Sequence, residues 1–184
     1  MKGTVIIMSN NIHSCNCGCN SHHHNHEKAS DSHSHHHHGC NCKTENITVK
    51  DITKTQIDFL HHLIEYHYLP VVQFIVKSTK EKDFESIALS PVFIIDTKDT
   101  MQDVKNIGEN LKQLEEKGLI TLDYDVTLDN YGYNEYYSSN LFDYFKKVVE
   151  QGKENENFLG DTADIQLGSM APTESAICLL NESK

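Results

Sequence analysis

The apolar positions are most regular between residues 100 and 128. Five apolar residues recur there every three or four positions: Met101, Val104, Ile107, Leu111 and Leu114. This period predicts an amphipathic helix over residues 101–117, with Thr100 and Asp103 as a capping box and Gly118 as its stop. Apolar and polar residues then alternate over residues 119–128, which predicts a strand with one buried face.

Weaker patterns flank this core. Thr53 and Gln56 fit a capping box at the start of a helix that continues to about residue 68. Thr173 would cap a last helix, ESAICLLNE. Between these ends we expect a short helix over 70–76, a loop over 78–83, a Tyr-rich loop over 129–140, a helix over 141–153 and a strand over 162–168. The pattern predicts an α+β domain over residues 47–184.

Residues 1–46 have a different composition, and we call them the Cys/His-rich tail. Five of the six cysteines and ten of the thirteen histidines of the chain lie between His13 and Cys42. The candidate metal ligands are His13, Cys15, Cys17, Cys19, His22, His23, His24, His26, His33, His35, His36, His37, His38, Cys40 and Cys42. Thiolate and imidazole are the ligands that borderline-soft divalent ions prefer, so the tail is a predicted metal-binding segment.

The spacing of these ligands indicates the kind of site. The cysteines come as C-x-C, and the residues between the two ends are polar, so nothing would pack as the core of a single zinc finger. We expect a tail that is disordered without metal and chelates several ions. Zinc suits both ligand types, with nickel, cobalt and Cu(I) as alternatives. Two other interpretations are an affinity tag, which the interrupted histidines disfavour, and solvated low-complexity sequence.

Charge limits what the domain can bind. The chain carries a net charge of −11 and has no Arg, and residues 47–184 hold 24 acids against 13 lysines. Duplex DNA is bound largely through Lys and Arg that neutralise phosphates, so an acidic domain binds it weakly. No phosphate loop, dinucleotide fingerprint or nucleophile motif is present, and we do not expect an enzyme. We interpret His61, His62 and His67 as surface residues and Cys178 as a core thiol.

A helix ending in LKQLEEKGLITL that runs into an alternating strand resembles the recognition helix and first wing strand of winged-helix transcription regulators. ITKTQIDFLHHL is similar to the start of their first helix, and DIQLGSMAPTESAICLL to their second wing strand and a following helix. The resemblance implies a winged-helix-like domain with a small antiparallel wing sheet. Two departures are the long apolar segment SIALSPVFII before the recognition helix and a helical insert at about 129–161 between the wing strands.

This resemblance implies a metal-linked transcriptional regulator. Its DNA-contacting residues would be Lys105, Asn106, Asn110, Lys112 and Gln113, which the helix pattern places outward. The alternative is a metal store or chaperone whose domain binds a protein, such as a metal transporter or a metalloenzyme maturation factor. A homodimer would concentrate the lysines for DNA.

We expect the chain to be cytoplasmic, with no membrane partner, because no apolar run approaches the roughly 20 residues of a membrane span. Thiols stay reduced in the cytoplasm, which favours metal ligation over disulfides. Translation could start at Met1 or at Met8.

Overall fold

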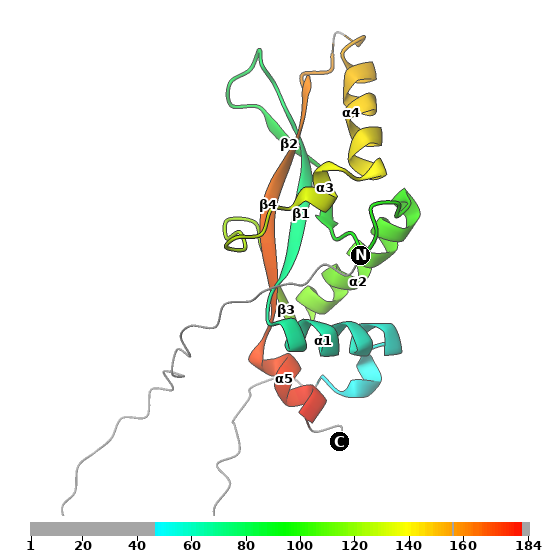
Figure 1. The fold of residues 1–184 in the computed structure, drawn as a ribbon, viewed down its shortest axis with the longest axis vertical. Coiled ribbons are helices and arrows are strands. Elements are labelled where there is room, and N and C mark those ends of the chain that lie inside the picture. The colour runs from blue at the N-terminus through cyan, green and yellow to red at the C-terminus, as the bar shows by residue number, and fades with distance from the viewer. Residues whose placement is uncertain (1–46, 156, 182–184) are drawn as a thin grey trace, which may run out of the picture. The chain divides into compact units, whose positions relative to one another are not determined.

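The computed structural model describes residues 47–155 and 157–181, which form a mixed α+β unit (Figure 1). Its elements are, in order, η1 (Val49–Asp51), α1 (Lys54–Tyr66), β1 (Leu69–Lys77), β2 (Glu85–Val92), α2 (Met101–Glu116), β3 (Ile120–Asp123), α3 (Asn134–Tyr137), α4 (Asn140–Gly152), β4 (Thr162–Pro172) and α5 (Glu174–Asn181). The expected α+β class is confirmed. The Cys/His-rich tail, with its expected disorder and its metal ligands, lies outside the described residues.

One antiparallel sheet organises these elements, with the strand order β2-β1-β4-β3. The central pair is β1 and β4, which stay in register from Leu69 opposite Met170 to Lys77 opposite Thr162. The pairing of β2 with β1 is irregular, with register shifts on either side of Phe74. The sheet therefore joins segments from both halves of the domain.

The two faces of the sheet carry separate cores. Val72, Phe74 and Val76 point to one face, where they pack with Phe142 and Phe145 of α4. On the other face lies a core shared by α1, α2 and α5, whose buried members include Leu60, Leu63, Val71, Leu111, Leu114, Met170, Leu179 and Leu180. Side chains alternate between the faces of a strand, so β1 contributes to both cores.

Helix α2 begins at Met101, as the sequence predicts, and ends at Glu116, one residue before the predicted end. The Thr100 hydroxyl accepts from the backbone N–H of Asp103, and the Asp103 carboxylate accepts from that of Thr100. At the other end Gly118 has φ +65°, and Leu119 N–H donates to Leu114 C=O at 2.9 Å. Glycine adopts this left-handed conformation without steric cost, so the chain leaves α2 directly into β3.

The expected helix over residues 70–76 is wrong, because these residues lie inside β1. The run is short and rich in Val and Ile, and periodicity alone does not separate a buried strand from a short helix. Pro70 stands second in β1, near the end of the strand, where proline is tolerated. The apolar segment before α2 holds a second strand, β2, so two strands connect α1 to α2.

The strand expected over 119–128 is shorter than predicted, because β3 ends at Asp123. The Asp123 carboxylate accepts from the N–H groups of Asp125 and Val126, which turns the chain away from β4. The expected Tyr-rich loop over 129–140 contains α3, and Tyr133 and Tyr136 are buried there. Both helices between β3 and β4, α3 and α4, therefore pack on the domain.

Candidate functional site

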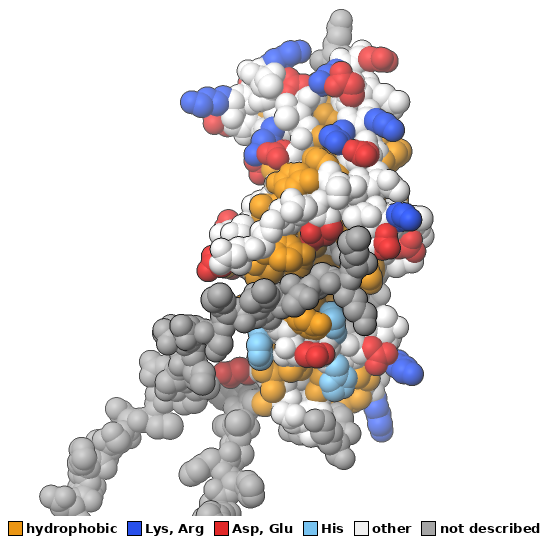
Figure 2. Space-filling view, viewed as in Figure 1, with side chains coloured by type: hydrophobic (Ala, Val, Ile, Leu, Met, Phe, Trp, Pro, Cys, Tyr) orange, Lys and Arg blue, Asp and Glu red, His pale blue; other side chains and the backbone are white. Residues whose placement is uncertain are grey.

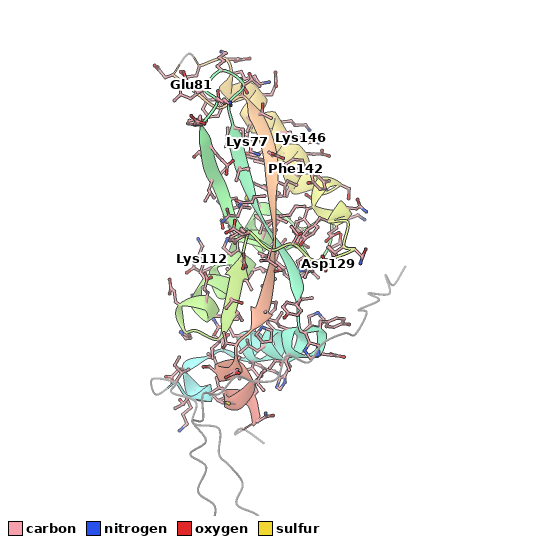
Figure 3. The ribbon with its side chains drawn as sticks, turned by 90° about the vertical axis from the view of Figure 1, so that its left-hand side faces the viewer. Lys77, Glu81, Lys112, Asp129, Phe142 and Lys146 are labelled. Carbon is pink, nitrogen blue, oxygen red and sulfur yellow. The ribbon has the colours of Figure 1, made fainter. Side chains whose placement is uncertain are left out.

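The outer face of α2 carries the residues predicted to contact DNA. Lys105, Asn106 and Lys112 are exposed, whereas Asn110 and Gln113 are half-buried. Lys112 is labelled in Figure 3, which draws the side chains of α2 as sticks. The opposite side of the helix is fixed in the interior by Val104, Gly108, Leu111 and Leu114. The amphipathic period thus sets which residues face outward.

The amide side chains on this helix are engaged within the domain. Gln113 accepts a hydrogen bond from the side-chain N–H of buried Gln56 at 2.9 Å, which joins α2 to α1. Asn110 donates to the backbone carbonyl of Asn106, and the Asn106 side chain accepts from Gln102. A bidentate contact with a base edge uses both amide atoms of a side chain, so it would require these bonds to open. For Gln113 it would leave the buried Gln56 amide unsatisfied.

The charges on the outer face of α2 are mixed. Exposed Glu109 lies four residues after Lys105 and three before Lys112, which places it on the same side of the helix as both lysines. Exposed Glu116 follows Lys112 at the same spacing of four. A DNA phosphate approaching either lysine would therefore also meet a carboxylate.

The segment between β3 and α4 is held against the sheet by tyrosines. The Tyr133 hydroxyl donates to Gly168 C=O at 2.7 Å, and the Tyr136 hydroxyl donates to Pro70 C=O at 3.1 Å. Burial raises the pKa of both phenols above the ordinary value for tyrosine. Tyr131 hydrogen-bonds to Glu135, and burial together with this carboxylate raises the pKa of Tyr131. These phenols are thus protonated anchors.

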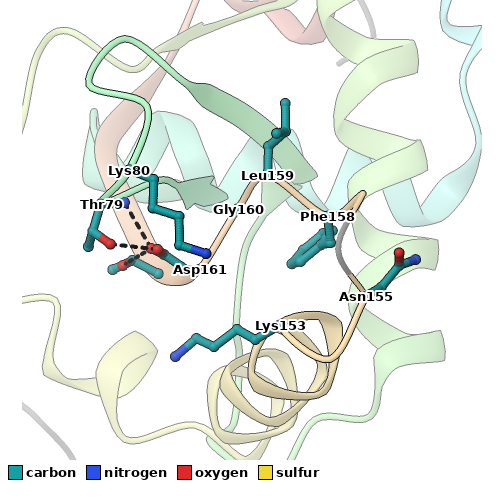
Figure 4. Close-up of a pocket in the computed structure, with 9 residues that line it drawn as sticks. Thr79, Lys80, Lys153, Asn155, Phe158, Leu159, Gly160 and Asp161 are labelled. Carbon is teal, nitrogen blue, oxygen red and sulfur yellow. Dashed lines mark hydrogen bonds between the residues drawn. The ribbon is translucent and has the colours of Figure 1, made fainter.

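A recess of about 370 Å³ lies where the β1–β2 hairpin meets the segment before β4 (Figure 4). Thr79 donates from its backbone and its hydroxyl to the Asp161 carboxylate, and these bonds lower the pKa of Asp161. Lys80 and Lys153 also line the recess, but Lys153 is paired with Glu150 at the end of α4. The arrangement anchors the hairpin and presents no convergent set of reactive groups.

Within residues 47–155 and 157–181, no three His, Cys, Asp or Glu side chains are arranged to hold a metal ion. Exposed histidines nevertheless gather around α1, as the pale blue side chains in Figure 2 show. They are His61, His62 and His67. Cys178, expected in the core, is half-buried on α5. The fifteen ligands predicted in the Cys/His-rich tail lie outside the part of the chain that the structure describes.

Comparison with known protein families, with curated proteins and with solved structures finds no match. In the described part of the chain, no helix is both long and apolar enough to cross a lipid bilayer.

Sequence reasoning missed the acidic neighbours of the α1 histidines, because it compared only the spacing between one histidine and another. Asp58 lies four residues before His62, and Glu65 lies four residues after His61. All four side chains are exposed. The helix pattern alone places these two carboxylates and two histidines on one face of α1, because residues four apart are neighbours on a helix surface.

Proposed function

We propose that this chain is a metal-binding protein whose Cys/His-rich tail takes up several transition metal ions, with zinc as the first choice. The observation that carries the proposal is the density of ligands, fifteen cysteines and histidines within residues 13–42. The domain after it has few cysteines and histidines, and in its described part no three His, Cys, Asp or Glu side chains are arranged to hold a metal ion. Most candidate ligands of the chain therefore lie in the tail.

We infer further that the domain is winged-helix-like and reports the metal state of the tail to a partner. Support comes from the sheet: α2 leads directly into β3, and β3 pairs antiparallel with β4, as two wing strands would. The pair of strands between α1 and α2 departs from that pattern, because a winged helix has a short helix there. In the leading version of this proposal, α2 contacts DNA through Lys105 and Lys112.

The alternative is a metal store or chaperone whose domain binds a protein. It is favoured by Glu109, which lies between the two lysines on the outer face of α2, and by Gln113, which is bonded to Gln56. In this version the metal-loaded tail delivers its ions to a transporter or a maturation factor.

Replacing Lys105 and Lys112 together by Gln separates the two versions. If α2 contacts DNA, a gel-shift assay on the DNA upstream of the protein's own gene, with zinc present, should show weaker binding. The salt slope should also fall by about two, because each phosphate contact contributes about one unit. Lys147→Gln, on the exposed face of α4, is the matched control and should change neither. If the native chain gives no zinc-dependent shift at low salt, the protein-binding version replaces the regulator.

The metal proposal itself is tested by changing Cys15, Cys17, Cys19, Cys40 and Cys42 to Ser in the full chain. Thiolates are preferred by zinc and Cu(I), whereas imidazoles suit nickel. Competition titrations should therefore show a much larger loss of affinity for zinc and Cu(I) than for nickel. Equal affinity for zinc before and after the change would contradict thiolate ligation.

A further inference from the structure

Histidine is confined to one end of this chain. Ten histidines lie in the Cys/His-rich tail, three lie at positions 61, 62 and 67, and none follows His67. The three that the structure describes are all exposed, at α1 and its C-terminal end. Helix α1 and the residue that follows it thus carry every imidazole of the domain.

The orientation of α1 is fixed from its buried side. Thr53 caps the helix with Gln56, and Gln56, Leu60 and Leu63 are buried. The two leucines belong to the core shared by α1, α2 and α5. This leaves Asp58, His61, His62 and Glu65 exposed on the opposite side. At 100° per residue the four positions fall within an arc of about 100°, so they share one outward face of the helix.

The spacing on this face matches pairs of metal ligands. Asp58 and His62 are four residues apart, as are His61 and Glu65, and residues at this spacing are neighbours on a helix surface. Helical metal sites use histidine and carboxylate pairs at spacings of three and four. Imidazole with carboxylate suits zinc, nickel, cobalt and Cu(II).

The local charges also favour a cation here. Among the described residues, no lysine forms an ion pair with Asp58 or Glu65. The His62 ring packs against the Tyr66 ring, with centroids 4.6 Å apart, which restricts where that imidazole can turn. A bound divalent ion would meet two carboxylates that form no ion pair with a described lysine, and a positioned ring.

We propose that the outer face of α1, formed by Asp58, His61, His62 and Glu65, is a metal site of the domain itself. It takes one divalent transition ion through a histidine–carboxylate pair, with water completing the coordination. It binds more weakly than the tail, because no three ligands converge there. The idea that this site links metal loading of the tail to the state of the domain rests on the proposed function. Metal binding at the site itself does not depend on that function.

Cobalt(II) titrated into the full-length protein labelled with ¹⁵N tests this site, because the ion is paramagnetic and a zinc substitute. Late in the titration, the amide signals of residues 58–65 should broaden. In the variant His61→Gln/His62→Gln the broadening should disappear, and cobalt uptake should fall by one equivalent. His67→Asn removes an exposed histidine beyond the end of α1, so it should leave both readouts unchanged.

Two results would overturn the site: no broadening at residues 58–65 at any cobalt level, or the same broadening and uptake in the double variant. The first result together with uptake of several equivalents would remove this site and leave the tail's function in place. Broadening at residues 58–65 with a total uptake of one equivalent would keep this site and contradict metal binding by the tail.

Discussion

His67 ends α1 in a backbone conformation that side chains rarely adopt. Its φ is +65° and its ψ −42°, and Tyr68 N–H donates to Tyr66 C=O at 2.8 Å across it. This geometry is that of the γ-turn with positive φ, which is rare and strained for any residue with a Cβ. The turn leads the chain from α1 into β1, so the strain is stored where the helix joins the central strand.

Replacing His67 by Gly should therefore stabilise the domain by about 1 kcal/mol, since relief of the strain outweighs the added freedom of the unfolded chain. Urea denaturation with a chelator present measures this change. His61→Gly is the matched control, and it should destabilise by roughly 1 kcal/mol because it lies inside α1. Destabilisation by both substitutions would contradict the strained turn.

Gln113 was predicted to contact DNA, yet its side chain accepts the hydrogen bond from buried Gln56. Gln113→Ala should destabilise the domain by roughly 1–3 kcal/mol, because it leaves the Gln56 amide without a partner. Asn106→Ala, on the exposed side of the same helix, should change the free energy of unfolding by less than about 0.5 kcal/mol. Equal small effects in thermal denaturation would show that the bond contributes nothing.

At the scale of elements, helix α2 contributes to both cores. Val104 belongs to the core under α4, and Leu111 and Leu114 belong to the core with α1 and α5. Leu111→Ala should cost roughly 2–5 kcal/mol, the usual range for a buried leucine truncated to alanine. Ile177→Ala on α5, where 40% of the side chain is exposed, should cost clearly less. A loss below about 0.5 kcal/mol for Leu111→Ala, measured in urea, would contradict the packing of α2.

The tyrosines at Tyr124, Tyr131, Tyr133 and Tyr136 make the region between β3 and α4 sensitive to alkali. Burial raises the pKa of each phenol, so the folded state favours the neutral form. The stability that the neutral phenols contribute is fully present below about pH 10, the pKa of tyrosine in the unfolded chain. It is lost as the pH rises through the raised pKa values of the folded state. Tyrosinate absorbance from these residues should appear together with loss of the circular dichroism signal.

Tyr136→Phe is the variant that tests this dependence. It should flatten the decrease in stability above about pH 10, because one group with a raised pKa is gone, while costing one hydrogen bond to Pro70 at neutral pH. If these tyrosines ionised while the circular dichroism stayed native, the phenols would not be the anchors that their bonds indicate.

The regular patterns of the sequence predicted α1 and α2 well, because capping boxes and a period of 3.6 are local. Thr53, Thr100 and Gly118 each mark a helix boundary in the structure as expected. The run from Pro70 to Val76 was misassigned, since its place in a sheet depends on β4, about ninety residues later. The burial of Tyr133 and Tyr136 was not predictable either, because it depends on carbonyls of β4 and β1.

The candidate functional residues were also predictable only in part. The candidate ligands of the Cys/His-rich tail can be found from composition alone, because recognising thiol and imidazole side chains requires no knowledge of the fold. The outward face of α2 was also predictable for Lys105 and Lys112, which are exposed. That Gln113 is bonded to Gln56 depends on the packing of α1 against α2, and no local pattern reports it.

At the scale of the whole molecule, the chain joins two parts of different chemistry. The Cys/His-rich tail is neutral apart from histidine, and the acids of the domain account for the net charge of −11. A divalent ion bound by the tail through neutral imidazole would add two positive charges to a chain whose domain is acidic. Metal loading would thus change the electrostatic relation between the two parts, which is a physical route from metal level to partner choice.

Native mass spectrometry of the full chain titrated with zinc shows whether the Cys/His-rich tail binds several metal ions. We expect more than one zinc ion per chain at micromolar metal, with proton release from the thiols as the ions bind. The variant with the five tail cysteines changed to Ser should carry fewer zinc ions under the same conditions. A chain that stays free of zinc throughout this titration would rule out metal binding by the tail.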